Sequence, residues 1–241
     1  MSANAKLQAP IGERIWQRLS PAQRLSRFAF YLLAVAAIVW SLRRIEIIPE
    51  FLYDAPQQTW DLFQRMWPMD WAYYPMGVHG ALMETFHIAT LGTLLALILG
   101  LPVALLAAKN ITKFKTLNWI AQFILVSSRS VNSLIWALLF VAIFGPGAIA
   151  GVLAIGFRSI GFVGKLLAEA IEEARPGPIE ALTSTGASPA SVLGKGYWPQ
   201  VEPSFWSVAL FRWDINIRES AILGLVGGGG IGVALDSALN N

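Results

Sequence analysis

Residues 180–199 read EALTSTGASPASVLGKGYWP and form a polar stretch between two long apolar segments. Ser188 and Pro189 make a favourable helix start, because a serine hydroxyl accepts a hydrogen bond from a free backbone N–H and proline suits the first helical turn. Gly186 permits a sharp chain reversal just before this start. The stretch is therefore predicted to form two short helices at an angle, separated by a turn at Gly186.

The composition on either side of this stretch is typical of a membrane protein. Hydrophobic residues make up 55% of the 241 residues, charged residues only 14%, and the mean hydropathy is +0.54. Because soluble domains carry about 25% charged residues, a soluble chain of this length would lack polar cover. The absence of cysteine excludes disulfides and thiolate metal sites. His79 and His87 alone are too few for a metal centre, so no metal site is predicted.

Five apolar runs are predicted to cross the membrane as helices, since about 20 residues suffice. They cover about 28–42, 82–108, 117–144, 148–171 and 204–226. The first run has the length of a signal peptide core. We interpret it as a retained span, because Arg43 and Arg44 close it and no cleavage site of small residues follows. Residues 127–130 interrupt the third run, and a run of glycines at 227–230 ends the fifth and is expected to bend the backbone.

Basic residues in short loops predict the orientation of the chain. The N-terminal segment holds Lys6 and four arginines against Glu13, and residues 109–115 hold three lysines and no acid. Acidic residues gather instead between the first two runs. The N-terminus is therefore predicted to be cytoplasmic, and alternating crossings place residues 180–199 on the cytoplasmic side. Aromatic residues at helical spacing predict an interfacial helix at about 57–66 on the outer side.

Charged residues inside the apolar runs are candidates for a transport pathway. An arginine at the bilayer centre costs about 2.5–3.5 kcal/mol on insertion scales, so it should face protein or a watery path. Arginine also offers planar, forked donors that suit phosphate-like oxyanions. The predicted pathway residues are Arg129, Ser130, Asn132, Arg158, Arg212, Asn216 and Arg218.

The alternative for these charges is a set of internal ion pairs that hold helices in register. Asp214 and Arg218 are four residues apart, and Arg212 and Glu219 are seven apart, so each pair lies on one side of a helix.

No motif predicts an enzymatic activity. The run GGGGIG at 227–232 matches Gly-x-Gly-x-x-Gly, but no strand precedes it as a dinucleotide site requires. Gly164-Lys165 and Gly194-Lys195 lack the first glycine and the final serine or threonine of a phosphate-binding loop. The chain is therefore predicted not to hydrolyse ATP. Its basic residues are spread along the chain rather than clustered, so no nucleic-acid binding is predicted.

The polar stretch resembles the coupling loop of ABC importer permeases, in which Glu-Ala-Ala is followed by glycine and then, thirteen residues later, by proline. The matching residues are Glu180, Ala181, Leu182, Gly186, Ala187, Ser188 and Pro199. Leu182 replaces the second alanine, and Trp198 stands where leucine is usual. Flanking blocks at 129–137, 159–178 and 212–227 are similar to the phosphonate-type permeases. The resemblance covers about 82–232.

This resemblance implies an all-α, polytopic membrane protein with the type I ABC importer fold. About five transmembrane helices are expected, and permeases of this kind commonly have a sixth after the glycine-rich stretch. Residues 1–81 would hold a cytoplasmic segment, the first transmembrane helix and the outer interfacial helix. Residues 82–241 would form the permease core, with the coupling loop at 177–200.

The resemblance also implies a function. The chain would be a permease subunit that moves phosphonate, phosphite or phosphate across the bacterial inner membrane by alternating access. It would bind no cofactor itself, because ATP and magnesium would be bound by two partner ATPase subunits. Its other expected partners are a second copy of itself, an external substrate-binding protein and the lipid bilayer.

Two alternatives stay open. One is an ABC importer permease for another small solute, such as an amino acid. The other is a structural or regulatory membrane subunit that transports nothing.

Overall fold

The computed structural model describes residues 21–45, 49–68 and 71–240. Every regular element in these ranges is a helix, which confirms the all-α prediction. The chain divides into two units, Met1–Met69 and Asp70–Asn241. The basic segment 1–20, Glu46 and Asp70, which entered the predicted orientation, lie outside the described residues.

The first unit contains α1 (Pro21–Arg44) and α2 (Pro49–Met66). α1 includes the first predicted span, and Arg43 and Arg44 occupy its last turn, where the helix dipole favours cations. α2 includes the predicted interfacial helix but begins at Pro49, earlier than the expected residue 57. Its large apolar side chains, such as those of Trp60 and Phe63, are exposed.

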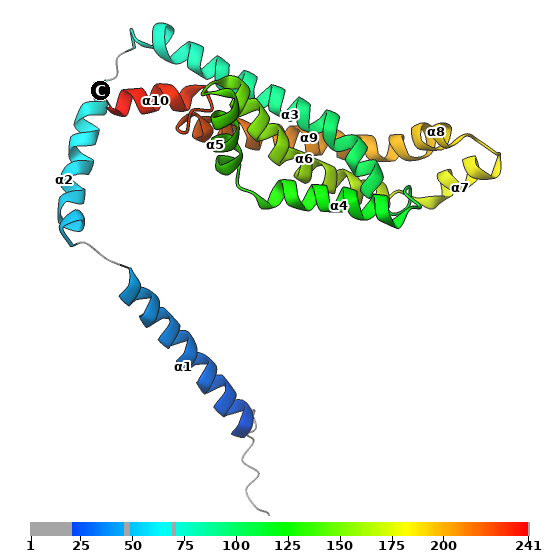
Figure 1. Cartoon of the computed structure of the whole chain (residues 1–241), viewed down its shortest axis with the longest axis horizontal. Coiled ribbons are helices and arrows are strands. Elements are labelled where there is room, and N and C mark those ends of the chain that lie inside the picture. Colours follow the sequence, from blue (N-terminus) through cyan, green and yellow to red (C-terminus); the bar gives the residue numbers. More distant parts are fainter. Residues whose placement is uncertain (1–20, 46–48, 69–70, 241) are drawn as a thin grey trace, which may run out of the picture. The chain divides into compact units, whose positions relative to one another are not determined.

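The second unit is a helical bundle. Within it α3, α4, α6 and α9 lie alongside one another, while α7 and α8 protrude at one end (Figure 1). Two short π-helical segments, η1 and η2, precede α3 and α9. The elements are η1 (Tyr74–Val78), α3 (His79–Ala107), α4 (Lys115–Ser130), α5 (Ser133–Phe144), α6 (Ala148–Glu172), α7 (Pro176–Ser184), α8 (Pro189–Ser191), η2 (Val192–Tyr197), α9 (Trp198–Gly224) and α10 (Ile231–Asn240).

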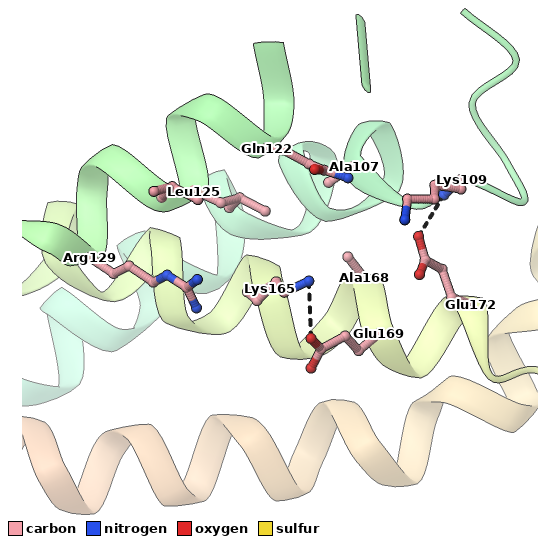
Figure 2. A pocket seen from close by; sticks show the side chains of 10 residues that line it. Ala107, Lys109, Gln122, Leu125, Arg129, Lys165, Ala168, Glu169 and Glu172 are labelled. Carbon is pink, nitrogen blue, oxygen red and sulfur yellow. Dashed lines mark hydrogen bonds and ion pairs between the residues drawn. The ribbon is translucent and has the colours of Figure 1, made fainter. Parts of the chain in front are cut away.

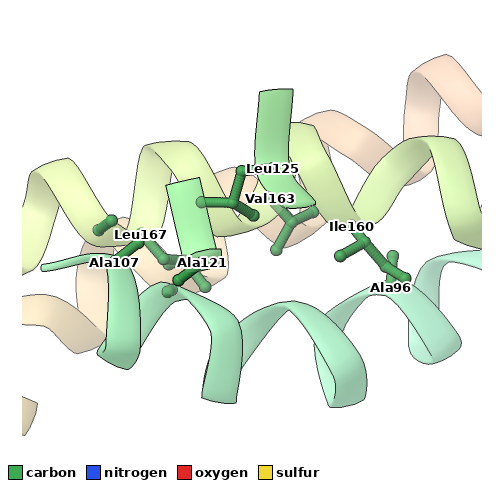
Figure 3. Packing of buried hydrophobic residues seen from close by; sticks show 9 residues of the cluster. Ala96, Ala107, Ala121, Leu125, Ile160, Val163 and Leu167 are labelled. Carbon is green, nitrogen blue, oxygen red and sulfur yellow. The ribbon is translucent and has the colours of Figure 1, made fainter. Parts of the chain in front are cut away.

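Helix α6 is the centre of the bundle and contacts α3, α4, α5 and α9. Its buried Ile160, Val163 and Leu167 pack against alanines of α3 and α4 (Figure 3). Such small residues let membrane helices approach closely. At Gly161 the approach is closest to α4, because a Cβ added there would lie 2.4 Å from the carbonyl oxygen of Leu125.

The third predicted span consists of two helices rather than one interrupted helix. α4 and α5 meet at an angle of 91°. The break falls at Val131 and Asn132, after the predicted interruption at 127–130, because α4 continues through Ser130. Asn132 begins α5, since its side-chain oxygen accepts a hydrogen bond from the backbone N–H of Leu134 at 3.0 Å.

The helices differ in how well they suit a membrane. In the described part of the chain, three segments are long and apolar enough to cross one: Ala22–Arg44, Tyr74–Ala107 and Ala148–Glu172. The bent pair α4–α5 makes a fourth if it counts as one span. α9 has 27 residues, so it is about 40 Å long. The fifth predicted span is thus long enough to cross a membrane. It is not among the three segments that are also apolar enough, and it carries four charged residues between 212 and 219.

The glycine run after α9 turns the chain, as predicted. Gly227, Gly229 and Gly230 have φ values of 89°, 82° and 75°, a backbone region that L side chains rarely adopt. The backbone N–H of Ile231 then donates to the hydroxyl of Thr85 at 2.7 Å. The helix that follows, α10, contacts α9 and α3. A further helix therefore begins where the sixth was expected.

Candidate functional site

Arg212 lies at the centre of a polar cluster between α6 and α9. Its side chain is only 3% exposed, and its Nε donates to the hydroxyl of Ser159 at 2.9 Å. Its Nη2 lies 3.2 Å from Oε2 of Glu219, which is seven residues further along α9. Arg158 of α6 pairs through Nη1 with the other oxygen of the same carboxylate. One carboxylate therefore holds two arginines.

Asn216 connects this cluster to α3 by buried hydrogen bonds. The Ser159 hydroxyl donates to Oδ1 of Asn216 at 3.2 Å, and Nδ2 of Asn216 donates to the hydroxyl of Thr93 at 2.8 Å. Thr93 in turn donates to the backbone carbonyl of Ala89 at 2.7 Å. Because buried polar groups cost free energy when they lack partners, this chain of bonds fixes the mutual positions of three helices.

A groove of about 560 Å³ opens beside the cluster, and we call it the arginine groove. It is lined by Val126, Arg129, Ser130, Arg158, Phe162, Arg212, Ile215 and Glu219. The Arg212 guanidinium lies 5.4 Å from the centre of the Phe162 ring. Arg129 forms no ion pair and no side-chain hydrogen bond with the residues that the structure describes. Three arginines thus face one carboxylate, which leaves the groove positively charged.

Of the seven predicted pathway residues, four line the arginine groove and three do not. Arg129, Ser130, Arg158 and Arg212 line the arginine groove. Asn132 instead caps the N-terminus of α5, and Asn216 is fully buried in the hydrogen-bond network that joins α6, α9 and α3. Arg218 lies outside the groove and pairs with Asp214, which confirms that ion pair.

Two residues of the cluster, Glu219 and Ser159, were not among the predicted pathway residues. The spacing of seven residues had indicated a pair between Arg212 and Glu219, and the structure confirms it. Nothing in the spacing showed that Glu219 also holds Arg158, which is on another helix. Ser159 was noted only as part of the block 159–178 that is similar to the phosphonate-type permeases, and nothing in the sequence indicated its bond to Arg212.

The predicted coupling loop has the turn that its sequence favours. Gly186 adopts a φ of 73°. Its N–H donates to the backbone carbonyl of Thr183 at 3.0 Å, and the N–H of Ala187 donates to the backbone carbonyl of Leu182 at 3.2 Å. The Ser188 hydroxyl accepts from the N–H of Ser191 at 3.3 Å, as predicted for a helix start.

The part after this turn differs from the prediction of a second separate helix. α8 continues through η2 directly into α9, so the expected short helix is the beginning of a long one. Pro199 lies in the first turn of α9.

The loop is exposed at its tip and held at its base. Glu180 and Ala181 are exposed, and α7 contains no buried residue. Gln200 holds the base, because its Oε1 accepts from the backbone N–H of Arg175 at 2.9 Å and its Nε2 donates to the carbonyl of Gly196 at 2.7 Å. The protruding helix pair therefore presents a firm surface at the end of the bundle (Figure 1).

The loop also lies at the same end of the bundle as the basic turn 108–114. The backbone N–H of Lys109 donates to Oε1 of Glu172 at 2.8 Å, and Nδ2 of Asn110 donates to the carbonyl of Ile171 at 2.7 Å. These bonds join the end of α3 to the end of α6, from which α7 follows. The two segments predicted to share one side of the membrane are thus neighbours.

Replacing Glu219 with glutamine is expected to destabilise the bundle, because Arg158 and Arg212 lose their shared counter-charge. Removing one partner of a buried ion pair costs about 3–5 kcal/mol, and we expect the lower part of that range because Arg158 is 28% exposed. Thermal unfolding in detergent measures the effect. The Asp214→Asn variant removes the same charge from the same helix at an exposed pair. Equal unfolding temperatures for both variants would contradict the assigned role of Glu219.

Comparison with known proteins supports the resemblance to importer permeases. Residues 100–241 match the family described as binding-protein-dependent transport system inner membrane component. The chain is 37% identical over 221 residues to a permease of Stutzerimonas stutzeri that is provisionally named for phosphite transport, covering 91% of this chain and 77% of that protein. It is 40% identical over 205 residues to a phosphate-import permease protein of Mycolicibacterium smegmatis, covering 84% of this chain but only 38% of that protein.

Solved structures support the fold. An inward-facing conformation of the MetNI methionine ABC transporter matches with a TM-score of 0.60 at 21% identity, covering 71% of this chain and 89% of that chain. A crystal structure of an amino acid ABC transporter with histidines matches with a TM-score of 0.52 at 24% identity, covering 65% and 72%. The predicted permease fold is therefore confirmed. The chain belongs to the family of inner-membrane components of binding-protein-dependent transport systems.

Proposed function

We propose that this chain is the permease subunit of an ATP-driven importer for a phosphorus oxyanion: phosphonate, phosphite or phosphate. The observation that carries this proposal is the arginine groove, in which Arg129, Arg158 and Arg212 face the single carboxylate of Glu219. Relatives named for phosphite transport and phosphate import support the same substrate class.

The charges in the groove suit a passing anion rather than a permanently bound one. Arg129 is placed to meet an arriving oxyanion, and guanidinium groups match the geometry of phosphate-like oxygens. Glu219 already pairs with Nη1 of Arg158 and Nη2 of Arg212, so the anion must compete with this carboxylate for those N–H groups. Competition weakens binding, and weak binding permits release on the other side.

The coupling loop would connect these helices to ATP hydrolysis. An exposed helix pair that is hydrogen-bonded at its base is a suitable surface for a cytoplasmic ATPase, and Glu180 and Gly186 lie in it. Two such ATPases would bind ATP and magnesium. Their closure would move the loop and tilt the bundle between outward-open and inward-open states, with the N-terminus in the cytoplasm.

The exposed ion pair of α9 supports a second copy of the chain. The side chains of Arg218 and Asp214 are 71% and 63% exposed, although they lie on a helix proposed to cross the membrane. Charged residues in such helices face protein or a watery cavity rather than lipid. A homodimer with the pathway between its copies would cover this face of α9 and give each of the two ATPases one loop.

Uptake into vesicles tests the proposed function. The transporter is assembled with its ATPase and binding protein, and ATP-dependent uptake of labelled phosphite is measured with unlabelled competitors. Phosphonate and phosphate are expected to compete, whereas methionine is not. Competition by methionine alone would favour an amino-acid permease. The absence of any ATP-dependent uptake would favour a structural or regulatory subunit.

A further inference from the structure

A second, smaller hollow lies between α4 and α6 at the coupling-loop end of the bundle, and we call it the exit pocket (Figure 2). Its volume is about 160 Å³. It is lined by Ala107, Lys109, Gln122, Leu125, Val126, Arg129, Lys165, Ala168, Glu169 and Glu172. Val126 and Arg129 also line the arginine groove, so the two hollows adjoin each other at these residues.

Helix α6 contributes charged side chains to both hollows. Arg158 lines the arginine groove, whereas Lys165 and Glu172 line the exit pocket. Residues seven apart lie nearly above one another on a helix and about 10 Å apart along its axis. These three side chains therefore lie on the same side of α6, which runs toward the end where the coupling loop begins.

The exit pocket is lined by three cationic side chains, Lys109, Arg129 and Lys165, and by two carboxylates, Glu169 and Glu172, so it has one more positive than negative charge. Glu169 pairs with Lys165 at 3.0 Å, and Glu172 accepts from the backbone N–H of Lys109 at 2.8 Å. The Lys109 amine and the Arg129 guanidinium have no ion-pair partner among the described residues. Lys165 and Glu169 are 40% and 46% exposed, so their pair is weak and exchanges readily for another anion.

We propose that the exit pocket is a second binding site for a phosphorus oxyanion, which a transported anion reaches from the arginine groove by way of Arg129. Lys165 and Lys109 would receive the anion as it leaves Arg129. This inference rests on the proposed function for the identity of the anion. The phosphate of a lipid headgroup has the same chemistry and is a second source, because basic pockets near the cytoplasmic ends of membrane helices bind such headgroups.

The lack of cysteine in the chain allows a direct test. Gln122→Cys places a thiol in the exit pocket, and Phe123→Cys places one on the next residue, which is 59% exposed and does not line the pocket. In the assembled transporter in phosphatidylcholine vesicles, we expect an anionic methanethiosulfonate reagent to modify the Gln122→Cys variant about fivefold faster than a cationic one does. Phosphite should slow this modification, and the Phe123→Cys variant should show neither effect.

Replacing Lys165 should abolish both the preference for the anionic reagent and the protection by phosphite. When Lys165→Gln is combined with Gln122→Cys, the thiol should lose its preference for the anionic reagent and its protection by phosphite. With the cysteine omitted, Lys165→Gln should lower phosphite uptake about tenfold, because one charge-assisted contact is lost. The control is Lys113→Gln, which removes an exposed lysine of the adjacent turn that does not line the pocket. Its uptake should equal that of the parent chain.

The outcomes separate the site, its ligand and the function. Protection by phosphite in phosphatidylcholine vesicles supports the transported anion as the ligand. Loss of that protection on adding phosphatidylglycerol, with normal uptake by Lys165→Gln, assigns the pocket to lipid and overturns the exit role. Equal modification of the Gln122→Cys thiol by both reagents, without protection, overturns the site while leaving the proposed function standing. Protection without uptake of any phosphorus oxyanion overturns the proposed function and leaves the site.

Discussion

Uptake of a phosphorus oxyanion is expected to fall about a hundredfold when Arg212 is replaced by alanine. The guanidinium connects Ser159 of α6 to Glu219 of α9 and faces the arginine groove. Its loss removes donors from the groove, and hydrogen bonds to charged groups contribute about 1.5–3 kcal/mol each. It also leaves Glu219 bound only to Arg158, which lowers the positive charge that an anion meets.

The Arg212→Lys variant separates charge from geometry. Lysine keeps the positive charge but has no planar fork, so one ammonium cannot hold Ser159 and Glu219 as the guanidinium does. We expect uptake between that of the parent chain and Arg212→Ala. Co-purification of the ATPase shows whether the variants still assemble. Normal uptake by a correctly assembled Arg212→Ala transporter would remove Arg212 from the pathway.

Replacing Gly186 with proline is expected to uncouple ATP hydrolysis from uptake. Gly186 has a φ of 73°, and its N–H donates to Thr183. Proline fixes φ near −65° and has no N–H, so the reversal between α7 and α8 cannot form as observed. The exposed surface of the loop would then change shape without any change in the helices of the bundle. We expect ATPase activity to persist while uptake per ATP hydrolysed falls by about tenfold or more.

Asparagine at the same position is the matched control. Asparagine adopts left-handed backbone conformations more readily than other residues with side chains, and it retains the N–H that bonds to Thr183. Gly186→Asn should therefore keep most of the coupling. Glu180→Lys, which reverses a charge on the exposed face of α7, tests the docking surface independently. Unchanged coupling in both Gly186→Pro and Glu180→Lys would contradict the role assigned to the loop.

Features that depend on neighbours in the sequence were predictable in detail. The turn at Gly186, the helix start at Ser188 and the ion pair between Asp214 and Arg218 all appear as expected. Each depends on residues no more than a few positions apart, because local backbone geometry brings such residues close to one another. The apolar runs likewise predicted the positions of the long helices.

Two features depend on contacts between helices, and neighbours in the sequence did not specify them. The interruption of the run at 117–144 was expected from its polar residues, but the angle of 91° between its halves, where Asn132 caps α5, was not. Asn216 has the residue type expected in a polar pathway, yet it lies fully buried between Ser159 and Thr93. Neither outcome could be read from spacing, since each depends on which helix packs opposite.

By itself, then, the sequence determined a helical membrane chain and the local shape of its polar loop, because hydropathy and backbone preferences act over short distances. Only the tertiary structure decided that Arg129, Arg158 and Arg212, from three helices, face one groove. The physical reason is the close packing of α4 on α6 at Gly161 and the buried hydrogen bonds from α9 to α6 and α3. These contacts set which side chains meet across helices, and no spacing within a single helix specifies them.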